Sequence, residues 1–130
     1  MKVIDGSGAV LGRLASYAAK QALKGEEIAI VNCNDVIISG NKRNIKENFE
    51  KKRGRIGHSQ KGPKHIRKSH RIVKRAIRGM LPDHRSGRGK QAFKRIKCYT
   101  GIPKEVDTSK IIKAGKENPM KFSKVKEFAK

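Results

Sequence analysis

Apolar residues in the first third of the chain predict a strand, a helix and a second strand. Val3 and Ile4 begin the first strand, and a continuous apolar run at 28–32 predicts the second. Between them, one helical stripe at spacings of three and four is made by Leu11, Leu14, Ala15, Ala18, Ala19, Ala22 and Leu23. Gly25 follows where a left-handed helix cap is favoured. This order predicts a βαβ unit, with parallel strands and a right-handed crossover.

A further strand and a second helix follow in the pattern. Residues 36–39 predict the strand, but its connection to the strand at 28–32 is too short for a crossover, so its pairing stays open. Residues 41–53 predict a helix with Ile45 and Phe49 on its core side. After residue 53, glycines, a proline and the loss of apolar periodicity predict a long extended loop.

The helix expected at about 69–80 has two contrasting faces, and Ser69 is expected to cap it. Its apolar face is formed by Ile72, Val73, Ala76, Ile77 and Met80. Its basic face, at the same helical spacing, is formed by Arg71, Lys74, Arg75 and Arg78. We therefore expect one face to dock on the sheet and the other to present its cations outward.

The rest of the pattern consists of short elements. A turn at Pro82, a glycine-punctuated basic loop and a short helix with Ala92 and Phe93 precede a last strand at 96–99. Beyond residue 104 the chain has an apolar pair at 111–112 and a short helix expected at 123–129. A small docking face in this tail is indicated by Met120, Phe122, Val125 and Phe128.

Charge divides the chain into unequal parts. The 130 residues carry 33 Lys+Arg and 11 Asp+Glu, a formal charge of +22, which opposes compaction by self-repulsion. Residues 1–50 are almost neutral, whereas residues 51–104 hold a single acid, Asp83, among 19 lysines and arginines. A solvated surface does not require so one-sided a composition. Residues 51–104 are therefore interpreted as the surface for an anionic partner, with nucleic acid favoured over an anionic membrane.

The glycine turn near the N-terminus resembles a nucleotide-binding loop only in outline. Gly6, Gly8 and Gly12 lack the spacing of dinucleotide and phosphate-binding loops. Asn32 closes the next strand, where a dinucleotide site needs an acid. We therefore interpret the turn as architecture, with Asp5 as its cap, and expect no nucleotide there.

The cysteines and histidines do not form a metal motif. Cys33 and Cys98 lack a C-x-x-C partner and are interpreted as small buried thiols of a cytosolic chain. The four histidines lack zinc spacing, and no carboxylates are paired for acid–base catalysis. No apolar run approaches the ~18 residues of a membrane span, and no signal peptide precedes the first strand. We therefore expect no metal, no cofactor, no small-molecule substrate and no membrane partner.

The positions of the aromatic residues indicate the mode of nucleic-acid binding. None is interleaved with the basic run at 51–79, and Phe49, Phe93 and Tyr99 occupy core-facing positions. Base stacking on a sheet is therefore disfavoured, and contact of arginines and lysines with the phosphates of a folded RNA is favoured. Two other classes stay open: a nucleotide-using or RNA-modifying enzyme, and a general polyanion or membrane-surface binder.

Four motifs together resemble one family. The stretches "VIDGSGAVLGRLAS", "NCNDVIISGNK", "RAIRGMLP" and "KCYTG" stand in the order and spacing of the universal large-subunit ribosomal protein thirteen family. The resemblance covers about residues 2–103, and its most specific part is the stretch from Arg78 to Pro82 with the basic residues up to Lys90. The loop at 58–71 and the lysine-rich tail resemble the archaeal and eukaryotic form.

The resemblance implies a three-layer α/β/α fold with a mostly parallel four-stranded sheet, and a structural, non-catalytic role in translation. We expect one RNA-binding domain at 1–104, with basic extension loops at about 51–71 and 82–95, and a lysine-rich tail at 105–130 with a short helix. The expected partners are large-subunit ribosomal RNA and neighbouring ribosomal proteins in the cytoplasm. The expected RNA-binding residues are Lys51, Lys52, Arg53, Arg55, His58, Lys61, Lys64, His65, Arg67, Lys68, His70, Arg71, Lys74, Arg75, Arg78, Arg85, Arg88, Lys90, Lys94 and Arg95.

Overall fold

A sheet of four parallel strands lies at the centre of the computed structural model, which describes residues 1–55, 64–116 and 118–128. In pairing order the strands are β4 (Ile96–Cys98), β2 (Ile28–Val31), β1 (Lys2–Asp5) and β5 (Ile111–Ile112). The register places Ile30 of β2 between Ile4 and Cys98. Parallel sheets are usually buried on both faces, which agrees with the uninterrupted apolar sequence of β2.

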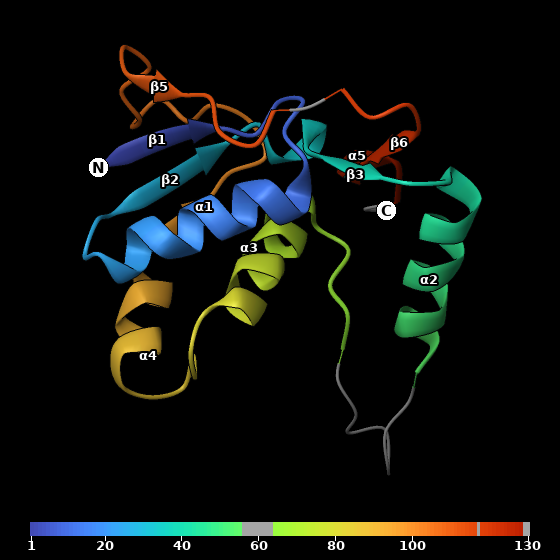
Figure 1. Ribbon diagram of the computed structural model, residues 1–130, viewed down its shortest axis with the longest axis horizontal. Helices are drawn as coiled ribbons and strands as arrows, with labels where there is room; N and C mark the ends of the chain where they lie inside the picture. Colours follow the sequence, from blue (N-terminus) through green and yellow to red (C-terminus); the bar gives the residue numbers. More distant parts are fainter. Residues whose placement is uncertain (56–63, 117, 129–130) are drawn as a thin grey trace.

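Helices cover one face of this sheet (Figure 1). They are α1 (Leu11–Leu23), α3 (Ser69–Met80) and α4 (Gly87–Lys94). The stripe of small residues on α1 is buried against the sheet and α3, with Ala18 and Ala22 at 0% exposure. After α1, Gly25 has a φ of 97° and its N–H donates to Ala22 O, which is the expected left-handed cap. The β1–α1–β2 unit with parallel strands is confirmed.

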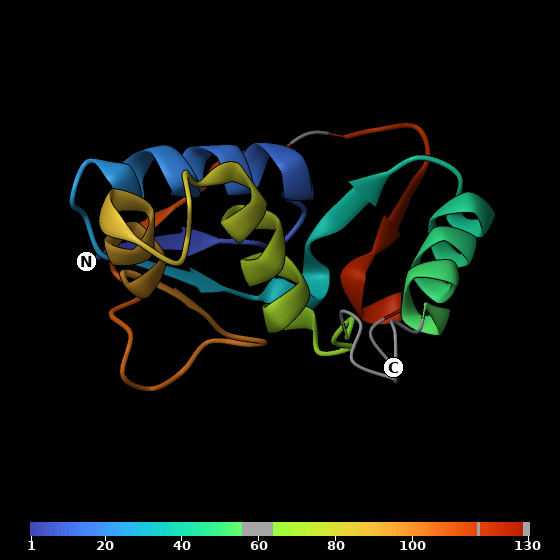
Figure 2. The same cartoon turned by 90° about the horizontal axis from the view of Figure 1, so that it is seen from below.

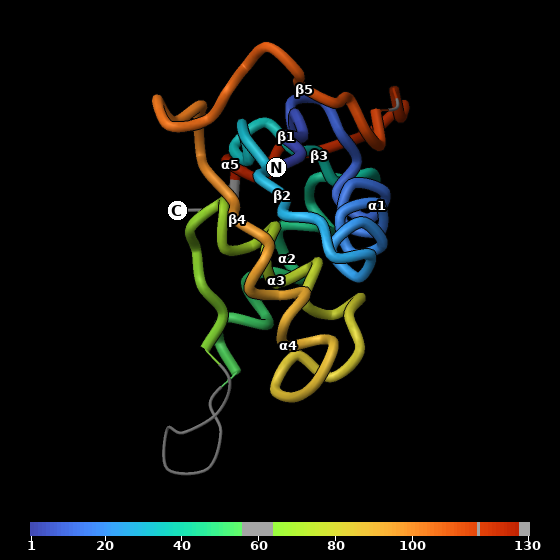
Figure 3. Tube along the Cα trace, turned by 90° about the vertical axis from the view of Figure 1, so that its left-hand side faces the viewer, coloured from blue at the N-terminus to red at the C-terminus, as the bar shows by residue number. Residues whose placement is uncertain are grey.

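The opposite face of the sheet is covered by the segment 99–110, which contains no helix (Figure 3). Val3, Ala29 and Val31 point to this side and pack with Val106, and Tyr99 lies partly buried against them. The expected α/β fold with a parallel four-stranded sheet is confirmed, and its third layer is this irregular segment. The strand β5 comes from the tail, so residues 111–112 belong to the sheet itself.

A second, smaller sheet lies beside the main one (Figure 2). In it, β3 (Ile37–Ser39) pairs antiparallel with β6 (Phe122–Lys124). This pairing answers the question that the sequence left open, because a short 3-10 turn, η1 (Cys33–Asp35), carries the chain out of the main sheet. The sheet is flanked by α2 (Lys42–Gly54) and by the short tail helix α5 (Val125–Phe128). Figures 1 and 2 place α2 at the end of the molecule opposite α4.

Three expected details are wrong. Ser69 does not cap α3, because it is the first helical residue and Lys68 occupies the N-cap position. Met80 is 45% exposed, because it lies in the last turn of α3, beyond the buried part of the helix. Phe93 is half-buried outside the core, where it contacts Lys74 and His84.

The glycine turn after β1 is closed by internal hydrogen bonds. The N–H groups of residues 6–10 donate, in that order, to Val31 O, Asp5 Oδ1, Asp35 O, Gly6 O and Gly115 O. A phosphate-binding turn needs such groups to point at the ligand, and here they are all used. The turn is therefore architectural.

Two of the three glycines explain why this turn cannot take larger residues. Gly8 has a φ of 70°, which favours glycine, and a Cβ on Gly6 would lie 2.8 Å from Val36 Cγ2. Nothing lies within 4 Å of a Cβ built on Gly12. The close approach to neighbouring atoms therefore lies at Gly6 and not at Gly12.

The carboxylate of Asp5 joins the turn to two distant parts of the chain. Its Oδ1 accepts from Ser7 N–H at 3.0 Å and from Asn32 Nδ2 at 3.1 Å, and its Oδ2 pairs with Lys116 Nζ at 3.1 Å. Partial burial acts to raise the pKa of Asp5, but these hydrogen bonds outweigh burial and hold the pKa below its ordinary value. The expected capping role of Asp5 is confirmed, and Lys116 brings the tail to it.

Gly6→Ala is expected to destabilise the protein, because the added Cβ also lies only 2.9 Å from Val31 O. Gly12→Ala is expected to keep the stability or to raise it by up to about 0.5–1 kcal/mol, because alanine is the better helix former and the space is open. Urea unfolding followed by circular dichroism compares the two variants. Equal midpoints would contradict the assignment of the close approach to Gly6.

Asp5→Asn is expected to lower the free energy of unfolding at pH 7 by on the order of 1–2 kcal/mol, because charge-assisted hydrogen bonds are lost. The lowered folded pKa of Asp5 means that its stabilisation is present above the ordinary value of 3.8 and is lost as the pH falls through the folded value. Urea unfolding at a series of pH values should therefore show the two proteins converging in acid. A difference that stays constant into strong acid would argue against the role of the carboxylate.

Candidate nucleic-acid interface

The helix α3 carries the two faces that its sequence predicts. Its inner side packs on α1 and β4 through the buried residues Ile72, Val73 and Ile77. On its outer side Arg71 is exposed. The other cations of this side are half-buried: Lys74, Arg75 and Arg78. The burial of the inner side fixes the direction in which all four cations point.

Neighbouring groups hold two of these cations in place. Arg75 Nη1 donates to Lys64 O at 3.4 Å, which joins α3 to the chain that precedes it. Lys74 Nζ lies 4.8 Å from the centroid of the Phe93 ring, and the His84 ring meets Phe93 edge-on at 6.2 Å between centroids. The cation–π contact links α3 to α4, and His84 adds the turn between them. Part of the basic face is therefore ordered within the protein itself.

The acid in the turn before α4, Asp83, closes the turn and forms no ion pair with the basic side chains of α4. Asp83 accepts from Arg85 N–H at 3.0 Å and from Ser86 Oγ at 2.9 Å, so its charge is used to close the turn. A Cβ on Gly89 would overlap the carbonyl oxygens of Pro82 and Asp83, which shows how closely α4 approaches this turn. The exposed cations that this arrangement presents are Arg85, Arg88, Lys90 and Lys94.

Most of the remaining predicted residues lie at the C-terminal end of α2, in the segment that precedes α3 or in the first turn of α3. Exposed side chains in this part are Lys51, Lys52, Arg55, Lys64, Arg67 and Lys68, and half-buried ones are Arg53, His65 and His70. His58 and Lys61 lie outside the described residues. Arg95 differs from the others, because its Nη1 donates to Ala22 O at 3.2 Å and so closes the end of α1.

The basic elements gather on one side of the molecule. Figures 1 and 3 place α3, α4 and the C-terminal end of α2 on the helix-covered side of the sheet, away from the segment 99–110. We call this side the basic surface, made of residues 51–55, 64–78 and 84–95. Its elements are far apart in sequence, and the fold brings them together.

In the described part of the chain, carboxylates leave the cations of α3 and α4 without an ion pair. Ion pairs in the described parts of the chain lie in the near-neutral half and the tail: Lys2–Glu26, Arg43–Glu47, Lys42–Glu127, Lys116–Asp5, Lys124–Asp35 and Lys126–Asp35. Within the same residues, no carboxylate pairs with a cation of α3 or α4. The basic surface therefore keeps its positive charge for a partner.

The positive surroundings also act on two histidines. Partial burial, followed by the charges of Arg75 and Lys52, lowers the pKa of His65. Partial burial, followed by the charge of Arg71, lowers the pKa of His70. Both imidazoles are therefore neutral near pH 7, and each offers one donor and one acceptor nitrogen.

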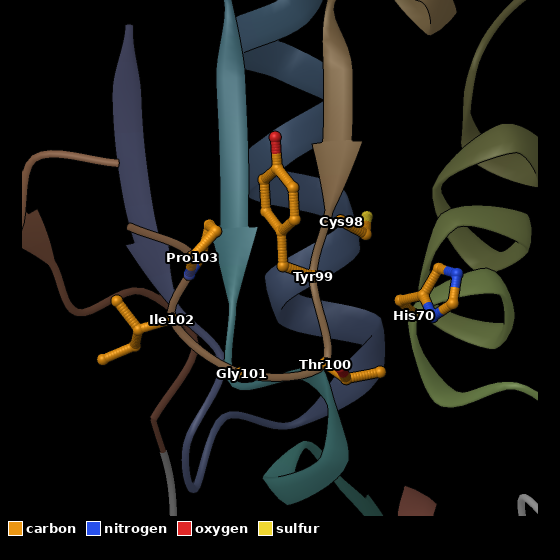
Figure 4. A pocket seen from close by; sticks show the side chains of 7 residues that line it. All are labelled: His70, Cys98, Tyr99, Thr100, Gly101, Ile102 and Pro103. Atoms are coloured by element: carbon orange, nitrogen blue, oxygen red, sulfur yellow. The ribbon is translucent and has the colours of Figure 1, made fainter. Parts of the chain in front are cut away.

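An alternative site is a hollow of about 410 Å³ at the carboxyl end of β4 (Figure 4). Residues 98–103 and His70 of α3 line it, and none of them is a lysine or arginine that could bind a phosphate. Hydrogen bonding with the Cys33 thiol and burial raise the pKa of the Cys98 thiol well above its ordinary value. A protonated thiol is a weak nucleophile and metal ligand, so Cys98 acts as a small packing residue. Cys33 is fully buried in the core and packs there.

The described ranges contain neither a metal cluster nor a membrane-spanning helix. No three side chains among histidine, cysteine, aspartate and glutamate lie together there as a metal site would require. The helices of these ranges are too short or too polar to cross a membrane.

The sequence interpretation missed the aromatic side chains of the basic surface. Lys52 Nζ and Arg53 Cζ lie 5.9 Å and 5.8 Å from the centroid of the Phe49 ring. Their spacing of three and four residues from Phe49 on one helix was a usable signal. The cluster of Phe93 with Lys74 and His84 joins separate elements, so only the tertiary structure could reveal it.

Comparison with known proteins identifies the family of the chain. The model of the family "Ribosomal protein L13" matches residues 1–105. The "Large ribosomal subunit protein uL13" of Methanosphaera stadtmanae is 40% identical over 129 residues, covering 97% of this chain and 90% of the relative. That of Methanocaldococcus jannaschii is 42% identical over 133 residues, covering 100% and 96%. That of Methanopyrus kandleri is 48% identical over 109 residues, covering 84% and 67%. The chain therefore belongs to the ribosomal protein L13 family, whose members are structural proteins of the large ribosomal subunit in translation and not enzymes.

Proposed function

We propose that this protein binds and stabilises folded large-subunit ribosomal RNA through phosphate-backbone contacts of its basic surface. The observation that carries the proposal is the set of cations on α3 and α4 with which no carboxylate of the described residues forms an ion pair. Their helices are fixed by burial of the opposite side, so the spacing of the charges is set by the fold. Arginine and lysine on such a scaffold bind phosphates and define the orientation of the RNA.

Both faces of the sheet are covered, which favours phosphate contacts over the stacking of bases on the sheet. Single-strand readers of the sheet type expose aromatic residues on an open sheet face. Here helices cover one face and the segment 99–110 covers the other. The RNA is therefore bound by helices and loops, and we expect specificity to come mainly from the shape of the folded RNA.

Neighbouring large-subunit proteins are the second class of partner, in the cytoplasmic ribosome. The tail offers Met120, which is fully exposed, and Phe122, which is 39% exposed. Exposed apolar residues close together favour protein contacts over phosphate contacts. The basic domain at 1–104 would then bind RNA, while the tail at 105–130 contributes to protein contacts.

Binding to large-subunit ribosomal RNA is expected to weaken steeply with salt, because each phosphate contact releases counterions. If about 6–10 phosphates are neutralised, the association constant should fall by roughly 10³–10⁵ between about 50 and 200 mM salt. Filter binding at several salt concentrations measures the slope. A flat response would refute the phosphate-contact proposal.

The double substitution Arg71→Glu with Arg75→Glu is expected to weaken RNA binding at least tenfold while the protein stays folded. Ile72→Asp should instead unfold it, because it places an unpaired charge where only 8% of the side chain is exposed. The matched control is Lys110→Glu with Lys113→Glu, which makes the same change in net charge at exposed positions beside β5.

Circular dichroism and filter binding on these three variants separate the two faces of α3. If the control weakens binding as much as the α3 variant, only net charge matters and the assigned surface is wrong. If the α3 variant unfolds, its faces are assigned backwards.

A further inference from the structure

A hollow of about 250 Å³ lies within the basic surface, between α2, the segment 64–68 and α3. Its apolar lining includes Phe49 of α2, Ile66 of the segment and Ile72 of α3. Ile66 is 41% exposed and Phe49 is half-buried, so apolar surface faces solvent here in the most basic part of the molecule. Contacts with phosphates alone do not require an apolar hollow.

Basic side chains surround this apolar lining. Lys52, Arg71, Arg75 and His65 also line the hollow, and no carboxylate is among its described lining residues. The charge of these side chains disfavours a cationic occupant and favours an anionic one. The apolar lining requires that the part entering the hollow be flat or apolar, with the negative charge staying outside. A nucleotide within an RNA chain has this distribution, with an uncharged base and a phosphate on each side.

The aromatic ring of Phe49 adds a geometric argument. Two cations, on Lys52 and Arg53, lie over or near this ring at just under 6 Å from its centroid. Unpaired RNA bases are bound by stacking on aromatic rings and on arginine guanidinium planes, and both groups are present here. His65 is neutral at physiological pH, because burial and the nearby cations lower its pKa, so it can donate or accept a hydrogen bond at a base edge.

We propose that this hollow binds a single unstacked nucleobase of large-subunit ribosomal RNA, whose flanking phosphates contact Lys52, Arg71 and Arg75. The inference rests on the proposed function, since it assigns to the same basic surface one point of base contact. The competing occupant is an apolar side chain of a neighbouring protein, and the arrangement of cations without a carboxylate favours the base.

Short-wavelength ultraviolet irradiation of purified large subunits tests the occupant directly. Stacked aromatic rings form covalent adducts with bases, and mass spectrometry after nuclease and protease digestion identifies the peptide and the nucleotide. We expect an adduct between the peptide containing Phe49 and one nucleotide. Subunits in which no nucleotide adduct forms on this peptide, or in which chemical crosslinking joins position 66 to another protein instead, overturn the proposal.

Affinity measurements with full-length large-subunit ribosomal RNA provide the second test. Phe49→Leu keeps an apolar side chain but removes the ring, and is expected to weaken binding roughly five-fold or more. Ile66→Trp, at an exposed position, fills the hollow and should weaken binding similarly without disturbing the fold. Tyr17→Leu is the matched control, because it removes a half-buried ring of α1 outside the basic surface. It should leave the affinity unchanged.

The salt dependence separates this inference from the proposed function. Phe49→Leu and Ile66→Trp remove no charge, so the slope of log affinity against log salt should equal that of the wild type. Lys52→Ala should make the slope shallower by about 0.7–0.9. If both hollow variants bind as tightly as the Tyr17→Leu control while the steep slope persists, the base site is refuted and the phosphate-contact proposal stands. If the wild-type slope is flat, both fail.

Discussion

The packing of α3 against α1 and the sheet is the contact on which the rest of the structure depends. α3 belongs to the basic half of the chain, and its buried residues Val73 and Ile77 enter the core that the near-neutral half builds. The stripe of alanines on α1 permits this, because small side chains let the two helices approach closely. Together with β4, whose Ile96 is fully buried in the same core, this contact holds the basic half to the sheet. With it, every cation on the outer side of α3 has a fixed direction.

The separation of apolar and charged groups also explains how a chain of charge +22 folds. Water and salt screen charges that stay on the solvated surface, so their mutual repulsion is much weaker than it would be in the core. The positions of the carboxylates contribute to the same separation of charges. Asp5 joins the turn, Asn32 and Lys116, and Asp35 pairs with lysines of the tail, so carboxylates hold the strands and the tail together. In the described residues, none of these carboxylates pairs with a cation of α3 or α4.

Periodicity predicted the parts of the fold whose apolar pattern is long enough to be unambiguous. The helix at 11–23, the strand at 28–31 and the two faces of α3 follow from repeats of several residues. The strands β5 and β6 are two and three residues long, so no pattern could distinguish them from a tail. Their pairing depends on contacts more than eighty residues apart along the chain, such as Val3 with Ile111 and Ile37 with Lys124. For the same reason the sequence did not reveal that Gly6, and not Gly12, approaches the neighbouring backbone.

The basic surface was predictable as a composition, whereas its internal organisation was not. Nineteen cations and one acid in residues 51–104 identify the segment, but nothing in that count tells which side chains meet. Phe49 follows the apolar pattern of α2, and this is a sufficient reason to assign it to the core. The fold places the same ring at the edge of the core, where it lines a hollow together with Ile66, Arg71 and Arg75. The Phe49 side chain therefore contributes both to core packing and to the hollow.

Because Phe49 lines a hollow among the cations, affinity for RNA and recognition of its conformation come from different groups. Phosphate contacts are strong but the same for every sequence, so cations alone would bind any folded RNA with similar strength. A base-sized hollow between rigid helices accepts only RNA in which one base is unstacked at the correct distance from the phosphates. Because α2 and α3 are both held by the core, this distance is set by the fold and not by a flexible loop. Shape recognition then has a defined physical origin: the cations supply the affinity, and the fixed position of the hollow among them selects the RNA conformation that can use all of them at once.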